Sequence, residues 1–367
     1  MLKEYKLTEI NQKCLKVWGR GSGRLDPLPV FWTGGGIELN VKAAELWVEV
    51  ETGSALYETW AAVLLDGDLI SRQMLPGGRG WVCLFRGMNP NTVKNLRLLR
   101  ETQAMPHDPE TRLFIHSIKT DGSLEPVAER PYKIEFVGDS ITTGEGLVGA
   151  KEVEDWVPMI ASAVYGFPQL VSEAVNAEYR VVSQSGWGVI SGWDNDPNSA
   201  LPPKYCAVCG LVTGGPNVEL GAYEPYDFAG WPADAVVVNL GTNDGGALSQ
   251  PEWTDPATGE TFRQTADPAG RAAFQKGVTD FLKLLREKNP GAWLVWAYGM
   301  CGPLMSLSIR EAICQYQEET GDRRVTFILL PDTTEETLGS REHPGKKAHE
   351  NAARVLAENL KALLAKS

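Results

Sequence analysis

Four short polar segments, far apart in the sequence, each come after an apolar run of strand length. They are GDS (138–140), SGWG (185–188), GTND (241–244) and EHPG (342–345), and they supply a serine hydroxyl, a glycine-flanked backbone, a carboxamide and an imidazole. Serine is a weak nucleophile until an imidazole accepts its proton, and the oxyanion of a tetrahedral intermediate needs preorganised N–H donors. These residue types therefore predict acyl-transfer chemistry.

The elements around these segments are predicted to bring them to one edge of a sheet. After Arg130, five apolar strand-like runs alternate with helical patterns, among them 154–177 (interrupted near Pro168), a helix ending near Gly291 and a final helix after Pro344. This alternation is typical of a three-layer α/β domain with a mostly parallel five-stranded sheet. Ligands bind beyond the carboxyl ends of such strands, where the four segments lie.

The first part of the chain has a different pattern of apolar and polar residues. From about residue 9 to 129 it shows short alternating segments, and Asp66-Gly67 between apolar runs is a strong hairpin signal. Regularly spaced strands with few helices predict an antiparallel β-sandwich or jelly roll. We therefore expect two domains, a sandwich over residues 1–130 and an α/β domain over 131–367.

The composition of the chain excludes several classes of binding partner. The net charge of −12 argues against nucleic acid and anionic membranes, and no run of 18 apolar residues is present. The N-terminal residues lack an apolar stretch of signal-peptide length, so we expect reduced cysteines and a cytoplasmic location. Cys206 and Cys209 form an isolated CxxC without further ligands, and no cofactor motif is present. We predict neither a metal nor a cofactor.

Together, in order and spacing, the four segments resemble the sequence blocks of the SGNH hydrolases, also called GDSL esterases. The preceding sandwich resembles the two-domain arrangement of carbohydrate esterase family 2, which removes acetyl groups from plant polysaccharides. The resemblance covers essentially the whole chain. It implies that Ser140 is the nucleophile and lends its backbone N–H to the oxyanion hole. It also implies that Gly186 and Asn243 are the other oxyanion donors and that His343 is the base.

The sequence departs from the SGNH pattern at one position. Many SGNH enzymes carry an Asp three residues before the histidine, where this chain has Ser340. Asp332 lies eleven residues before the histidine, and Glu342 is directly adjacent to it. Family 2 includes members that use a Ser–His dyad with a backbone carbonyl orienting the ring. We favour such a dyad, with Glu342 as the alternative, and the group that orients His343 stays open.

Other polar and aromatic residues near these segments have ordinary structural explanations. Asp139 is expected to hydrogen-bond its own turn, Asp244 to have a structural role, and His349 to be a surface or packing residue. Trp187, beside the oxyanion glycine, is equally well explained as a sugar platform or as core, and Trp193 is a weaker platform candidate.

The predicted function is a serine esterase that removes O-acetyl groups from plant-derived oligosaccharides of the xylan or mannan type. The alternatives are an SGNH lysophospholipase or thioesterase acting on acyl chains, and a non-catalytic glycan-binding protein. The sequence does not choose the sugar, the hydroxyl position or the oligomeric state. Both the sandwich and the long segment 192–232 are compatible with a wall of the active site or with a contact in a homo-oligomer.

Overall fold

The structure, a computed structural model, describes residues 1–365, which form two compact units. The first unit contains Met1–Glu129 and two later segments, Trp156–Val164 and Cys206–Tyr226. The second unit contains the remaining described residues from Arg130 onward. The boundary between the units therefore lies after Glu129, and two later segments of the chain also belong to the first unit.

The first unit is an antiparallel β-sandwich, as the short alternating segments predict. One sheet contains β1 (Lys3–Lys6), β3 (Leu28–Pro29), β5 (Glu45–Gly53), β8 (Gly78–Arg86) and β10 (Arg112–Thr120). The other contains β2 (Lys16–Trp18), β4 (Gly36–Lys42), β6 (Trp60–Leu65), β7 (Asp68–Met74), β9 (Val93–Arg100) and β11 (Ser123–Glu125). The predicted hairpin is confirmed: β6 and β7 pair antiparallel around Asp66 and Gly67, both at positive φ.

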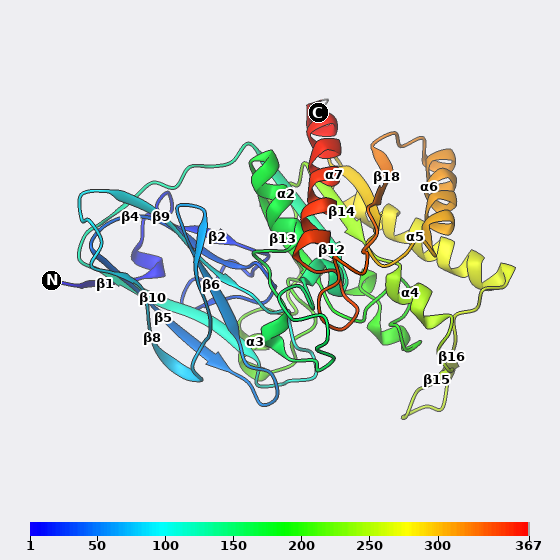
Figure 1. Cartoon of the computed structure of the whole chain (residues 1–367), viewed down its shortest axis with the longest axis horizontal. Helices are drawn as coiled ribbons and strands as arrows, with labels where there is room; N and C mark the ends of the chain where they lie inside the picture. Colours follow the sequence, from blue (N-terminus) through cyan, green and yellow to red (C-terminus); the bar gives the residue numbers. More distant parts are fainter. Residues whose placement is uncertain (366–367) are drawn as a thin grey trace. The chain divides into compact units, whose positions relative to one another are not determined.

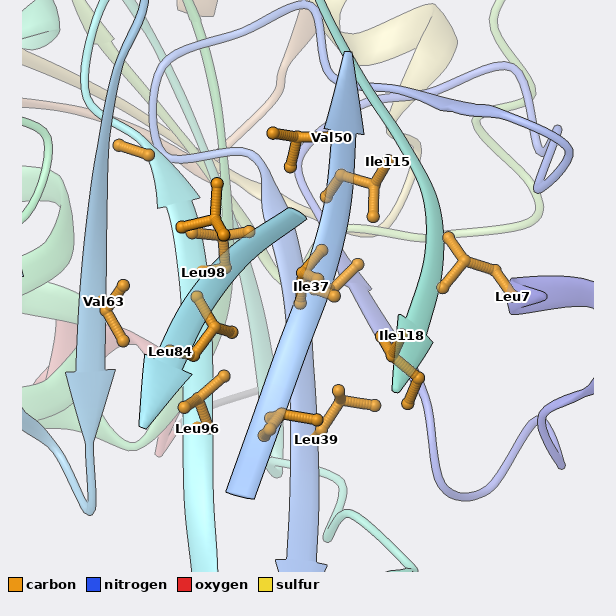
Figure 2. Packing of buried hydrophobic residues seen from close by; sticks show 14 of the residues in the cluster. Leu7, Ile37, Leu39, Val50, Val63, Leu84, Leu96, Leu98, Ile115 and Ile118 are labelled. Atoms are coloured by element: carbon orange, nitrogen blue, oxygen red, sulfur yellow. The ribbon is translucent and has the colours of Figure 1, made fainter. Parts of the chain in front are cut away.

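Alternation of side chains along the strands builds the core of this unit. In β5 every second residue is buried, because successive side chains point to opposite faces of a strand. Figure 2 shows Ile37 and Leu39 of β4 among apolar side chains contributed by strands of both sheets. Burying this apolar surface is the main force that stabilises the sandwich.

The second unit is the predicted α/β domain. Its sheet contains β12 (Tyr132–Gly138), β13 (Ala177–Ser183), β14 (Ala235–Asn239), β17 (Trp293–Gly299) and β18 (Val325–Leu330), in the order β13-β12-β14-β17-β18, and every pair is parallel. All five residues of β14 are buried, as expected for a central strand covered on both faces. The strand order reverses between β12 and β14, which is where open α/β sheets bind ligands.

Helices cover both faces of this sheet (Figure 1). One pair is α2 (Phe167–Val175) and α7 (Lys346–Leu364), and the other is α5 (Pro268–Lys288) and α6 (Ser306–Thr320). The shorter helices are α1 (Ser140–Thr143), α3 (Gly215–Glu219) and α4 (Thr242–Ala247), and a small hairpin is formed by β15 (Trp253–Thr254) and β16 (Thr261–Phe262). Within residues 1–365, no helix combines the length and apolar character needed to cross a membrane.

The prediction of a largely helical segment over 154–177 is wrong for its first half. Trp156–Val164 contains only a short 3-10 helix at Pro158–Ile160, and the α-helix begins at Phe167. In the first unit, Arg72 donates to the carbonyl oxygens of Met159 and Ala161. Those carbonyls therefore bond to a side chain outside the segment, and Pro158 lacks the N–H that a helix interior needs.

His349 lies at the contact between α2 and α7. It is fully buried, its Nδ1 accepts the backbone N–H of Phe167 at 3.1 Å, and its ring stacks on the Phe167 ring at a centroid distance of 6.0 Å. Burial lowers the pKa of His349 from 6.5 to about 3, and the nearby His343 contributes to the shift. Of the two roles expected for His349, surface or packing, the structure shows packing, and the ring stays neutral.

This burial makes the fold sensitive to acid. Above about pH 6.5 the neutral ring has no effect, but below it the unfolded chain binds a proton that the folded chain cannot. The free energy of unfolding should therefore lose about 1.4 kcal/mol per pH unit from this residue between about pH 6.5 and 3. In His349→Gln that loss should be absent. Urea denaturation at several pH values should show the stability difference moving in the variant's favour as the pH falls.

The matched control is His107→Gln, because His107 is exposed to solvent. Its stability should follow that of the unmodified chain at every pH. A His349→Gln curve parallel to that of the unmodified chain from pH 8 to 4 would contradict the assignment.

Candidate active site

The strand register brings three of the four predicted segments to one edge of the sheet. Gly138, at the end of β12, pairs with Ser183 of β13 on one side and Asn239 of β14 on the other. The loops carrying Ser140, Gly186 and Asn243 therefore leave the sheet at the same level. Ser140 and Asn243 follow β12 and β14, the two strands between which the strand order reverses.

Ser140 is the first residue of α1, directly after β12. Asp139 caps this short helix, and its Oδ1 accepts the N–H of Ile141 at 3.0 Å, which is the turn role expected for it. Gly138 is required at the preceding position, because a Cβ there would lie 1.9 Å from the hydroxyl of Thr142. The tight turn leaves Ser140 only 7% exposed.

His343 contacts this serine. Its Nε2 lies 2.9 Å from the Ser140 Oγ, and its Nδ1 lies 2.6 Å from the backbone carbonyl oxygen of Arg341. A carbonyl can only accept, so Nδ1 carries the proton of the neutral ring and Nε2 is left as the acceptor of the serine O–H. The contact thus has the tautomer that a general base requires.

The carbonyl of Arg341 is the group that the sequence left unidentified. Arg341 and Glu342 both have positive φ, 55° and 54°, so the chain reverses sharply just before His343. The side chain of Glu342 is exposed to solvent. Ser340 is fully buried, and its hydroxyl donates to the carbonyl oxygen of Gly146.

The loop that carries His343 is fastened to the loop that follows Ser140. The N–H of Ser340 donates to the carbonyl oxygen of Gly146 at 2.9 Å, and the N–H of Arg341 donates to that of Val153 at 3.0 Å. Gly146 has a φ of 72°, and a Cβ there would lie 2.3 Å from the Ser340 carbonyl oxygen and 2.7 Å from the His343 Cβ. Its small size is therefore a condition for the approach of His343.

Asn243 is held between the other two loops. Its Nδ2 donates to the carbonyl oxygen of Trp187 at 2.9 Å and lies 3.3 Å from the Asp139 Oδ2. Asp244 accepts the N–H groups of Val189 and Ile190, which ties the Gly186 loop to α4. The structure therefore brings Ser140, Gly186, Asn243 and His343 together, and Asp244 has the structural role expected for it.

Of the two tryptophans in the Gly186 loop, Trp193 is the better candidate for a sugar-stacking platform, although the sequence favoured Trp187. Trp187 is only 8% exposed, so its ring is part of the core and offers no face for stacking on a sugar. Trp193 is 52% exposed, and its ring lies against Gly186, where an added Cβ would be 3.2 Å from the Trp193 Cδ1. The prediction of Trp187 as a substrate-binding residue is corrected on this ground.

Buried carboxyl groups lie beneath the site. Burial raises the pKa of Asp139 to about 7, and the nearby Asp244 adds to the rise. The hydrogen bond from the N–H of Ile141 acts in the opposite direction and lowers the pKa. Burial also raises the pKa of Asp244. Near neutral pH the carboxyl next to the amide of Asn243 is therefore partly protonated.

Sequence reasoning gave no role to Glu145, which lies in the turn after α1. It is 4% exposed, and its Oε1 is 3.1 Å from the Arg341 Nε and 3.9 Å from the His343 Nε2. The only sequence signal was a charged residue between two glycines next to the serine block. Among the residues described, no group of three or more His, Cys, Asp and Glu side chains could hold a metal ion.

Comparison with known proteins finds relatives among both curated proteins and solved structures. No protein-family model matches the chain. Among curated proteins it is 22% identical over 341 residues to the cellulase/esterase CelE of Acetivibrio thermocellus, of which it spans 37%. It is 25% identical over 328 residues to an acetylxylan esterase / glucomannan deacetylase of Cellvibrio japonicus, covering 83% of this chain and 82% of the relative.

Two solved structures extend this likeness. An acetyl xylan esterase, Est2A, from the rumen bacterium Butyrivibrio proteoclasticus matches with a TM-score of 0.98 and 44% identity, over 99% of both chains. A family two carbohydrate esterase from Clostridium thermocellum, in complex with cellohexaose, matches with a TM-score of 0.78 and 22% identity, over 96% of this chain and 99% of that one. The second likeness shows the fold alone.

The packing around Gly146 yields a test of the geometry. Gly146→Ala should displace the His343 loop, because the added methyl would overlap the Ser340 carbonyl and the His343 Cβ. We expect the rate at which a fluorophosphonate labels Ser140 to fall by about tenfold or more, since labelling needs an activated serine. The measurement is the labelling rate by intact-protein mass spectrometry.

Gly321→Ala is the matched control. Gly321 has a φ of 71°, and an added Cβ would have no atom within 4 Å, so this variant has the backbone strain without the overlap. It should label at the rate of the unmodified chain. Equal labelling of both variants would mean that the His343 loop tolerates the methyl group.

Proposed function

This chain belongs to the two-domain, family 2-like carbohydrate esterases of the SGNH hydrolase superfamily, and from that premise we propose that it removes O-acetyl groups from plant-derived oligosaccharides. The observation that carries the proposal is the Ser140–His343 contact of 2.9 Å, with Nδ1 of the ring bonded to a carbonyl oxygen. The proposed mechanism is a Ser–His dyad that passes through an acyl-enzyme.

In the first step, the Ser140 Oγ attacks the acetyl carbonyl carbon while His343 Nε2 takes the hydroxyl proton. The bond from the carbonyl carbon to the sugar oxygen then breaks, and His343 returns the proton to that oxygen. In the second step, water gives a proton to His343 and attacks the acetyl-serine; acetic acid leaves as Ser140 recovers its proton from His343, and the acid then ionises to acetate in solution. The Arg341 carbonyl accepts from Nδ1–H throughout and orients the ring.

The oxyanion would be bound by N–H donors from three loops. The backbone N–H groups of Ser140 and Gly186 and the Nδ2 of Asn243 are the proposed set. Two observations support this assignment: the backbone at Gly186 has a φ of 80°, and one N–H of Asn243 Nδ2 is fixed by the carbonyl of Trp187 at 2.9 Å. The other N–H, which faces the Asp139 Oδ2 at 3.3 Å, is the one that would turn to the oxyanion. Donors fixed before the reaction lose little free energy to reorganisation when charge develops.

An acetylated xylan- or mannan-type oligosaccharide is the substrate we propose. Support comes from the 44% identity to an acetyl xylan esterase and from the likeness to an acetylxylan esterase / glucomannan deacetylase. The exposed ring of Trp193 beside Gly186 would give a sugar a flat apolar face close to the scissile ester.

The direct test is acetate release from acetylated xylo- and manno-oligosaccharides. We expect release from at least one class, and hydrolysis of p-nitrophenyl esters that falls steeply from acetate to octanoate. Ser140→Ala should lower turnover by roughly 10⁴-fold or more, because removal of a nucleophile disables the dyad. Its thermal midpoint should stay close to that of the unmodified chain.

Two results would count against the proposal. Activity that rises with acyl-chain length would favour a lysophospholipase or thioesterase. Full turnover by Ser140→Ala would remove the nucleophile assignment.

Trp193 gives a separate prediction about substrate binding. Trp193→Ala should raise KM for an acetylated oligosaccharide by about tenfold, the scale of a lost stacking contact, and leave KM for p-nitrophenyl acetate unchanged. The small ester is the control, because it shares the acetyl group and lacks the sugar. Equal changes for both substrates would mean that Trp193 shapes the site without contacting the sugar.

A further inference from the structure

Glu145 is a buried carboxylate that the proposed mechanism does not use. One of its oxygens, Oε1, lies 3.1 Å from the guanidinium Nε of Arg341 and 3.9 Å from the Nε2 of His343. Its residue exposure is 4%, so water screens it weakly. The carboxylate therefore faces the ring nitrogen that takes the serine proton and, at the same time, the side chain of the residue whose carbonyl orients that ring.

Arg341 is held at several points. Its Nη1 donates to the carbonyl oxygen of Glu154 at 2.6 Å, its Nε pairs with Glu145, and its backbone N–H donates to the carbonyl of Val153. These contacts hold a non-glycine residue at a φ of 55°, a conformation that is unfavourable for most side chains. The same conformation accompanies the 2.6 Å contact of its carbonyl with His343 Nδ1.

The position of Glu145 differs from that of a triad acid. A triad acid accepts the Nδ1–H, but that proton is bonded here to the Arg341 carbonyl, and Glu145 approaches the opposite nitrogen. The distance of 3.9 Å is that of an ion pair and is longer than a hydrogen bond. A neutral carbonyl can orient an imidazole, but it does not supply the negative charge that stabilises an imidazolium.

We propose that Glu145 is a positioning residue for His343, which holds Arg341 in its left-handed conformation and places a negative charge beside the imidazolium formed during the reaction. The inference rests on the proposed Ser–His mechanism and assigns a source for the charge that an Asp at position 340 would have brought. The groups in contact with the ring are Ser140, Glu145 and Arg341, and His349 of α7 interacts with it electrostatically.

Two substitutions separate an electrostatic role from a purely structural one. Glu145→Gln keeps the size and an acceptor oxygen but removes the negative charge, so the imidazolium loses its attraction. Arg341→Gln removes the positive charge and leaves Glu145 unopposed. The acid limb of the kcat/KM profile for p-nitrophenyl acetate should therefore move to lower pH in Glu145→Gln and to higher pH in Arg341→Gln.

Kinetics at the plateau give the second readout. In Glu145→Gln, kcat should fall by about tenfold or more with KM within about twofold, because the lost charge acts on the transition state. The matched control is Asp322→Asn, which breaks the similarly shielded Arg286–Asp322 pair of 2.7 Å. It should lower the thermal midpoint without moving the profile.

Side-chain NMR of His343 tests the coupling without turnover. The midpoint of its titration should move in opposite directions in Glu145→Gln and Arg341→Gln. Shifts in the same direction, or no shift in folded variants, would overturn the inference while acetate release by the unmodified chain still supports the esterase. Absence of acetate release with opposite NMR shifts would reject the proposed function and keep the charge coupling.

Discussion

The geometry of the candidate active site depends on the imidazole of His343, which makes a hydrogen-bond contact at each of its two nitrogens. The Arg341 carbonyl can only accept a hydrogen bond, so it fixes the proton on Nδ1 and leaves Nε2 facing the Ser140 hydroxyl. Neither contact alone would define a base, because a neutral ring free at Nδ1 could present its proton to the serine instead. The α/β unit must therefore place a backbone carbonyl and a hydroxyl on opposite sides of one ring.

The sheet supplies one side of this arrangement and a loop supplies the other. Ser140 is fixed by β12 and the cap of α1, which buried strands and short local hydrogen bonds define. The His343 loop has no strand pairing of comparable length, and it is fastened to residues that follow Ser140, at Gly146 and Val153. Ser140 and His343 therefore share one local framework, so their separation does not depend on the distant end of the sheet.

The difference between the sheet and the loop explains which features of the fold and the site could be predicted from the sequence. The strands, the hairpin at Asp66-Gly67 and the meeting of three strand ends follow from local patterning and from the geometry of parallel sheets. A backbone carbonyl was the favoured orienting group, but the residue that supplies it could not be predicted, because a backbone carbonyl has no side-chain signature and its direction depends on the φ of Arg341. The burial of Trp187 and the incorporation of Trp156–Val164 into the first unit depend on tertiary packing. The spacing of apolar residues along the sequence does not predict such packing.

The serine at position 340 also acquires a physical explanation. This position is fully buried, and its hydroxyl donates to the Gly146 carbonyl oxygen. A carboxylate there would meet an acceptor instead of a donor and would lose its hydration, which is costly for an unpaired charge. The site therefore combines a neutral orienting group on the backbone of the His343 loop with a charge in the turn after α1, Glu145, that already has Arg341 as its partner. Orientation and charge, which one aspartate supplies in a triad, are divided here between two residues.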